Sequence, residues 1–249
     1  MKLTQAERAE NREAFRDMGL PEKLDYIFTY YKFPLVLALI AAVALGSVGY
    51  HRLTHKDARL YAAYANISVG SVLDGALNQG FIESLGLNPR RNEVYAYPGL
   101  YLTQDASTEN HEYAYASQLK LLAAISGEKL DVLLMNREAY DLVSSGGYLM
   151  PLEGLAADHP ELSARLAEHL TENTVILEDN DIEHRLDESV PYRAVTETAV
   201  NAIEVTAFPL FESAGFSGEV FLGVLGNTPR MDTVIRYIDY LTSRAAVEP

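Results

Sequence analysis

Residues 33–50 read FPLVLALIAAVALGSVGY, and no charged side chain interrupts them. As an α-helix this stretch would be roughly 27 Å long, close to the hydrocarbon thickness of a bilayer. The chain before it is short and charged, and the chain after it is long, acidic and patterned like a folded domain. The stretch therefore predicts a transmembrane helix at residues 33–50. It separates an N-terminal helical segment (residues 1–32) from a polar stalk (residues 51–59) and a C-terminal domain (residues 60–249).

The charges on either side of this stretch set its expected orientation. Six Lys and Arg residues precede it, and three follow it within residues 51–59. Because positive charge is in excess on the cytoplasmic side of membrane helices, we expect residues 1–32 in the cytoplasm and the C-terminal domain outside the cell membrane. Two alternatives stay open: a signal peptide cleaved near Ala44-Leu45-Gly46, and a buried helix of a soluble protein.

Negative charge is concentrated in the C-terminal domain. The whole chain has a formal net charge of −15. Residues 60–249 hold eleven Lys and Arg against twenty-eight Asp and Glu, a net charge of −17. A domain this acidic repels nucleic acid and anionic lipid, so we expect no nucleic-acid partner. The absence of cysteine excludes disulfides, thiol catalysis and a lipid-modified cysteine anchor.

Strand-like and helix-like patterns alternate along the first half of the domain. Strands are predicted at residues 60–69, 92–97 and 130–135, and the last, LDVLLM, is a continuous apolar run typical of a strand buried on both faces. Helices are predicted at residues 71–85, 108–126 and 136–143, the second with Tyr115, Leu119, Leu122 and Ala123 on one face. This order predicts an α/β fold with a mainly parallel sheet and helices on both faces.

The second half of the domain is less regular. Helices are predicted at residues 160–170 and 228–243, and strands at residues 200–208 and 219–225. Residues 178–188, EDNDIEHRLDE, predict a polar loop or an exposed hairpin. Four carboxylates there could chelate calcium, but the loop lacks the glycine and the terminal Glu of an EF-hand. We therefore favour a solvated acidic loop and expect no metal site.

Residues 119–155, LKLLAAISGEKLDVLLMNREAYDLVSSGGYLMPLEGL, carry the most specific pattern in the chain. A helix leads into a strand that begins with Asp131, a short helix contains Tyr140, and a Gly-Tyr-Leu-Met-Pro-Leu run closes the segment at residues 147–152. Residues 215–241 add an apolar strand, an Asn-Thr-Pro turn and a closing helix. In this order the two segments resemble bacterial extracellular solute-binding proteins of the maltose-binding type. The resemblance implies one lobe of a type 2 periplasmic-binding-protein-like fold.

The chain departs from that family between the two matched segments. The family inserts a whole second lobe there, whereas this chain has only residues 156–200, too few for a lobe with its own core. The lipidated cysteine is also missing. We therefore expect residues 156–200 to form a reduced second-lobe region, with the two-walled clamp around a solute much reduced or absent.

Candidate binding residues follow from the predicted sheet, because ligands of open parallel sheets collect beyond the C-terminal ends of the strands. Ser71 and Asn136 begin helices at that edge and would offer free backbone N–H groups. Tyr97, Tyr101 and Tyr140 would add flat apolar surface beside them. The alternatives are that this edge is solvated loop and that the tyrosines pack at strand ends.

No motif in the chain points to catalysis. His111-Glu112 does not extend to the H-E-x-x-H zinc motif, and neither a phosphate-binding loop nor a dinucleotide fingerprint is present. We expect no cofactor and no enzymatic activity. The sequence predicts a non-catalytic binding domain that resembles a solute-binding protein and is anchored in the membrane of a bacterial cell envelope. The alternative is a protein-interaction or envelope scaffold without a small-molecule ligand.

Overall fold

In a computed structural model of the chain, the structure describes residues 19, 21, 23, 32–54, 56–105, 109–153, 159–187 and 189–243. The chain divides into two compact units, Met1–His55 and Lys56–Pro249. The helical segment predicted for residues 1–32 lies almost wholly outside the described residues. The predicted stalk at residues 51–59 is divided between the units, because α3 continues to Thr54 and the first strand begins at Asp57.

The first unit contains helix α3, Lys32–Thr54, which includes the uncharged stretch. Apolar side chains such as Phe33, Leu37 and Leu45 are exposed along it. Within the part of the chain that the structure describes, however, no helix combines the length and the apolar character needed to cross a membrane. The helix at residues 33–50 was predicted, but its spanning role is not supported by the described helices.

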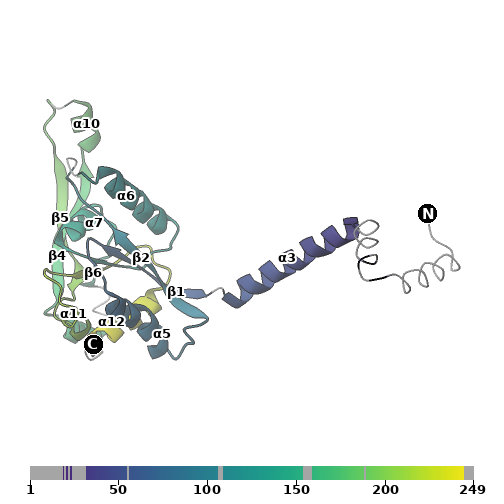
Figure 1. Cartoon of the computed structure of the whole chain (residues 1–249). Coiled ribbons are helices and arrows are strands. Elements are labelled where there is room, and N and C mark those ends of the chain that lie inside the picture. The colour runs from purple at the N-terminus through teal and green to yellow at the C-terminus, as the bar shows by residue number, and fades with distance from the viewer. Residues whose placement is uncertain are drawn as a thin grey trace. The chain divides into compact units, whose positions relative to one another are not determined.

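The second unit is built on one six-stranded sheet in the order β2-β1-β3-β6-β5-β4 (Figure 1). The strands are β1 (Asp57–Ala65), β2 (Asn92–Leu100), β3 (Val132–Met135), β4 (Leu170–Asp179), β5 (Ala194–Glu204) and β6 (Phe221–Val224). β1 pairs in parallel with β2 and with β3. The pairings of β3 with β6, β6 with β5 and β5 with β4 are antiparallel. The α/β fold is confirmed, but the prediction of a mainly parallel sheet was only partly right.

The two halves of the sheet differ because their connections differ. A run of short helical elements at residues 71–84 lies between β1 and β2, and a helix at residues 111–126 lies between β2 and β3; such crossovers return the chain in parallel. β4 and β5 instead form a hairpin, with helix α10 (Asp181–Leu186) between them. The residues expected to form a reduced second lobe therefore extend the first sheet.

Helices cover both faces of the sheet, as predicted. One face packs Leu134 of β3 and Leu222 of β6 in a core that also holds Phe81 and Ile238. The other face packs Leu133 of β3 in a core shared with Tyr140. The helices of the first face are α4 (Ser71–Gly75), η1 (Ala76–Gly80), α5 (Phe81–Ser84), α9 (Pro160–Leu166), α11 (Pro209–Glu212) and α12 (Met231–Ser243), and those of the second are α6 (His111–Ser126) and α7 (Arg137–Ser145).

The two segments that carry the family resemblance meet in the structure around Asp131. Its side chain is fully buried and accepts hydrogen bonds from the Tyr61 N–H at 2.7 Å and from Arg230 Nε at 2.8 Å. Thr228, of the Asn-Thr-Pro turn, donates to the other carboxylate oxygen. A buried charge needs partners of this kind, so Asp131 at the start of β3 holds the turn before α12 in place.

The β4–β5 hairpin projects beyond its neighbours (Figure 1). β5 pairs with β6 only through Ala202–Glu204, whereas β4 and β5 pair with each other along their whole length. We refer to residues 173–199, the outer part of this hairpin with α10, as the arm. All side chains of β5 from 194 to 198 are exposed. The arm is thus a two-stranded ribbon with little core beneath it.

Candidate functional site

The structure brings together only some of the predicted binding residues. The parallel strands β1, β2 and β3 end at one edge, because Ala65 is the partner of both Leu100 and Met135. Tyr101 and Asn136 directly follow β2 and β3 and so lie at this edge. Ser71 is the first residue of α4, and that helix is only five residues long.

Hydrogen bonds within the chain occupy much of this edge. The side chain of Asn66 donates to the Leu102 carbonyl at 2.6 Å and accepts from the Leu102 N–H at 2.8 Å. The N–H of Tyr101 donates to Ser117 on α6 at 3.1 Å. Asn136 is the N-cap of α7, and its side chain accepts from the Ala139 N–H at 3.0 Å. The free N–H groups expected here are thus partly satisfied by the protein itself.

Tyr140 offers no surface to a ligand, because its side chain is 0% exposed. Its hydroxyl lies 2.7 Å from Asn201 Oδ1 and 3.1 Å from the Thr171 carbonyl, and burial raises the pKa of this hydroxyl. Tyr97 is half-buried, with its ring 5.0 Å from the Tyr95 ring and the Lys120 ammonium over it at 5.4 Å. Burial also raises the pKa of Tyr97.

A second region, which the sequence analysis did not identify, is an open groove of about 1210 Å³ between α6 and the arm. One wall is formed by α6, including His111, Tyr115, Gln118 and Leu122. The opposite wall is formed by the arm, including the four consecutive β4 residues from Ile176 to Asp179. The remaining lining comes from Thr103–Asp105, the end of α7, Tyr148, α10 and Tyr192.

The groove exists because α6 packs through an unexpected face. The helix buries Ala114, Ser117, Leu121 and Ala124, most of which are small side chains that allow close approach to the sheet. The face predicted from Tyr115, Leu119 and Leu122 instead points outward, and these side chains are 63%, 49% and 39% exposed. The signal in the sequence is this stripe of large apolar side chains. An exposed stripe and a core-facing stripe have the same helical spacing, so the sequence could not show which of the two it is.

The arm contributes apolar side chains as well. Leu177, Tyr192 and Val195 are all exposed, and so are Ile182 and Leu186 of α10. Single exposed apolar residues are ordinary on a protein surface, but a contiguous set is typical of an interaction site. Leu177 and Tyr192 line the groove together with Tyr115 and Leu122 of α6.

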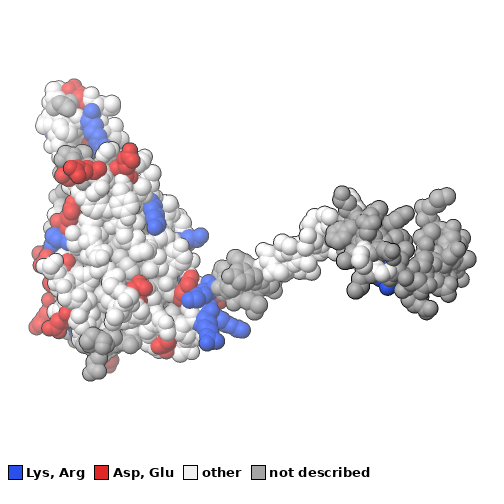
Figure 2. Space-filling view, in the orientation of Figure 1, with Lys and Arg blue, Asp and Glu red and all other residues white. Residues whose placement is uncertain are grey.

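The groove is acidic as well as apolar. Its lining includes the carboxylates of Asp105, Glu178, Asp179 and Asp181 against one guanidinium, that of Arg185. Arg185 is itself paired with Asp181 at 2.9 Å. Figure 2 shows acidic side chains on several parts of this face of the second unit, including the part near α10. An acidic, apolar groove attracts cationic partners with apolar side chains.

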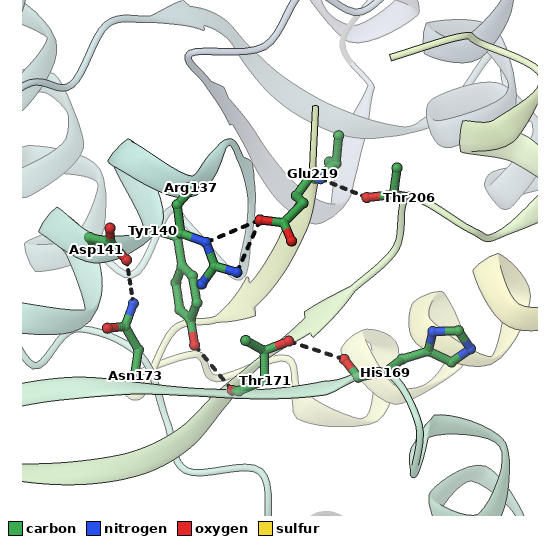
Figure 3. Close-up of polar contacts among 9 residues, drawn as sticks. Arg137, Tyr140, Asp141, His169, Thr171, Asn173, Thr206 and Glu219 are labelled. Carbon is green, nitrogen blue, oxygen red and sulfur yellow. Dashed lines mark hydrogen bonds and ion pairs between the residues drawn. The ribbon is translucent and has the colours of Figure 1, made fainter. Parts of the chain in front are cut away.

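Contacts between α7 and β4 hold the inner part of the arm (Figure 3). Besides Tyr140, which reaches Thr171, Ser144 donates to the Thr174 carbonyl at 3.1 Å. The Asn173 amide donates to Asp141 at 2.8 Å. Helix α7 therefore supplies two side-chain donors, Tyr140 and Ser144, and one acceptor, Asp141, to β4, which is the outermost strand of the sheet.

Among the described residues, no group of three or more His, Asp or Glu side chains is arranged to hold a metal ion. Two of the four carboxylates considered for calcium have partners within the chain: Asp179 accepts from the Asp181 N–H at 3.2 Å, and Asp181 is paired with Arg185 at 2.9 Å.

Comparisons with known proteins give no information about the site. No protein-family profile matches the chain, and no curated protein matches it. Among solved structures, an OxyR mutant from Corynebacterium glutamicum aligns with 11% identity, covering 90% of this chain and 75% of that chain, with a TM-score of 0.28. A TM-score this low carries no argument about fold or function. The resemblance to maltose-binding-type proteins therefore stays a prediction.

Proposed function

We propose that residues 56–243 form a non-catalytic domain that binds another protein through the groove between α6 and the arm. The observation that carries this proposal is the exposed apolar surface of the groove, to which Tyr115, Leu122, Leu177 and Tyr192 all contribute. Large apolar side chains without a core beneath them stabilise a protein when a partner covers them.

The size of the groove supports a protein partner over a small solute. Pockets for small molecules typically enclose about 300–1000 Å³ and bury most of the ligand. The groove encloses about 1210 Å³ and is open to solvent. Such a groove fits a segment of polypeptide, whose ends continue beyond the groove.

The proposal places this domain outside the cell membrane, attached through α3. The support is the uncharged stretch at residues 33–50 and the excess of Lys and Arg before it. A further part of the proposal is that the domain is a lobe of the solute-binding type, which the pattern of residues 119–155 and 215–241 supports. Protease added to intact cells is expected to digest residues 60–249 and to spare residues 1–30.

Site-specific photo-crosslinking tests the function directly. A benzophenone amino acid would replace Tyr115 or Leu122 in the full chain, expressed in cells that natively produce the protein. Val72 on α4 is the matched control, because it is 57% exposed and lies outside the groove lining. We expect one protein adduct of defined mass from both groove positions and none from Val72. Adducts from neither groove position would contradict the proposal.

The same preparations separate this function from solute binding. Small solutes that raise the melting temperature of the parent, and fail to do so after Tyr97→Ala with Tyr101→Ala, would favour the strand-end edge as the site. If crosslinks form at the groove and no tested solute behaves in this way, a protein partner is favoured over a small solute.

A further inference from the structure

We propose that the partner segment binds as an extended strand along the outer edge of β4 beyond Thr174, and that this segment is cationic. This inference rests on the proposed protein-binding function and names the partner chemistry and the binding mode of the same groove. Its starting point is that β4 is an edge strand of the sheet. The outer edge of such a strand carries unpaired backbone N–H and C=O groups, which are a template for a further strand.

Helix α7 covers only the inner part of that edge. Tyr140 and Ser144 bring hydroxyl groups to the carbonyls of Thr171 and Thr174. The helix ends at Ser145, and Gly146 and Tyr148 after it line one end of the groove. Beyond Thr174, no side chain among the described residues donates to a carbonyl of this edge. The strand itself continues to Asp179. The β4 edge beyond Thr174 is therefore not covered by α7 and lies along the groove.

The outer part of β4 lines the groove. Four consecutive residues, Ile176 to Asp179, belong to this lining. A groove along a strand edge is lined by consecutive residues. The register shift between Ile176 and Glu178 also interrupts the regular alternation of side chains at this point. The open length matches the five or so residues of an ordinary strand.

The opposite wall provides apolar contacts for the added strand. Tyr115 and Leu122 of α6 face the groove across from β4, and Tyr192 lies in the arm itself. An extended segment would pair its main chain with β4 and place alternate side chains toward these residues. This is the general mode of β-strand addition, in which backbone bonds supply affinity and side-chain contacts supply specificity.

The negative charge of the β4 edge indicates which charge a partner segment should carry. Glu178 and Asp179 stand on the open part of β4 and are exposed. Residues 60–249 carry eleven basic against twenty-eight acidic side chains, so a second copy of this domain would bring the same negative field to the edge. Like charges on neighbouring strands are destabilising, whereas opposite charges are favourable. A segment with Lys or Arg at alternate positions therefore fits this edge.

Synthetic peptides test both parts of the inference on the full-length chain. The first probe is a peptide of about nine residues in which Lys alternates with Val or Thr, and its twin has Glu in place of each Lys. Two further versions of the Lys peptide carry N-methyl groups on alternate amides, one version for each of the two sets. Binding is measured by fluorescence anisotropy in uncharged detergent, with a detergent blank.

We expect the Lys peptide to bind at least about tenfold more tightly than the Glu twin. We also expect one N-methylated version to lose about tenfold or more in affinity and the other to bind like the parent peptide, because only one set of amides faces β4. In the protein, Glu178→Lys should lower the affinity for the Lys peptide about tenfold. Glu168 is exposed and lies outside the groove lining, so Glu168→Lys should change this affinity little.

Equal binding of the Lys and Glu peptides, or no binding of the Lys peptide, would overturn the cationic assignment. Equal sensitivity to both N-methyl sets would overturn strand addition and indicate a helical or irregular segment. In either case crosslinks from Tyr115 and Leu122 would leave the proposed function standing. The absence of those crosslinks would refute the function itself, so the two failures are distinguishable.

Discussion

The two strands β3 and β4 belong to one sheet, yet different forces hold them in place. All four residues of β3 are buried, with helices on both faces. β4 contains no buried residue, and its outer part has only β5 as a neighbouring strand. Burial of apolar surface stabilises β3, whereas backbone hydrogen bonds and the side chains of α7 stabilise β4. The core half of the sheet is therefore held by its own packing, whereas the outer part of β4 has little packing of its own.

The strongest test of this contrast is a charge in the core strand. Leu133→Asp would place a carboxylate at a fully buried position without a partner. We expect the free energy of unfolding of the full chain to fall by about 4 kcal/mol or more in urea denaturation. A loss under about 1 kcal/mol would mean that β3 is not a core strand.

A second core test removes the partner of Asp131. Arg230→Met would leave the buried carboxylate with only the Tyr61 N–H and the Thr228 hydroxyl as donors. We expect a loss of about 3 kcal/mol in the same denaturation experiment. The double change Asp131→Asn with Arg230→Met is the control, and it should cost less than the single change. If the double change costs more, the ion pair does not account for the effect.

The junction between core and arm should respond to a smaller change. Tyr140→Phe removes the hydroxyl that serves Asn201 and the Thr171 carbonyl. We expect a loss of about 2 kcal/mol in the free energy of unfolding, because the single hydroxyl hydrogen is lost and a buried acceptor is left unpaired. Tyr97→Phe, at a half-buried ring, is the matched control and should change stability by less than about 0.5 kcal/mol. Equal effects of the two variants would argue against the buried network.

Alkaline pH provides a test confined to the core. Burial raises the pKa of Tyr237, so this tyrosine stays neutral in the folded chain above pH 10 while it ionises in the unfolded chain. Its contribution to stability is complete below pH 10 and falls by about 1.4 kcal/mol per pH unit as pH rises toward the folded pKa.

The variant Tyr237→Phe checks this assignment. The Tyr237 hydroxyl has no hydrogen-bond partner among the described residues, so the change should leave stability at pH 7 nearly unaltered. At pH 11 the variant should retain about 1.4 kcal/mol more of its neutral-pH stability than the parent does. Identical pH profiles would show that Tyr237 is not desolvated.

The smallest effect is expected in the arm. Leu177→Ser and Val195→Thr change side chains that are 54% and 57% exposed. We expect each to alter the free energy of unfolding by less than about 0.5 kcal/mol. A loss above about 2 kcal/mol would contradict the contrast, since it would mean that these side chains are packed in the folded chain.

The sequence was sufficient to predict several elements: strand β3, the helix at residues 33–50 and the order of elements up to α7. A short and mainly apolar run such as LDVLLM is typical of a strand buried on both faces, and the Asn136 cap marks the start of α7 locally. β4 was not predicted, because its outer residues have neither a core face nor a regular apolar period. Strands that overlap β5 and β6 were predicted at residues 200–208 and 219–225. Their antiparallel direction was not predicted, because it depends on the connections between strands.

The groove could not be predicted, because it depends on which face of α6 packs. Both faces offer helical spacing, one from small residues and one from Tyr115, Leu119 and Leu122. Likewise, the sequence placed Tyr140 near a binding edge, and only the structure shows it buried against Asn201.

The sequence alone thus determined the composition of the chain, its acidic character and the strands that burial selects. Local residues suffice for these features, because apolar runs and capping residues act within a few positions of the chain. Only the tertiary structure decided which helix face is exposed and where an edge strand runs free. Those features depend on contacts between segments far apart in the chain, such as Tyr140 with Asn201 and Asp131 with Arg230.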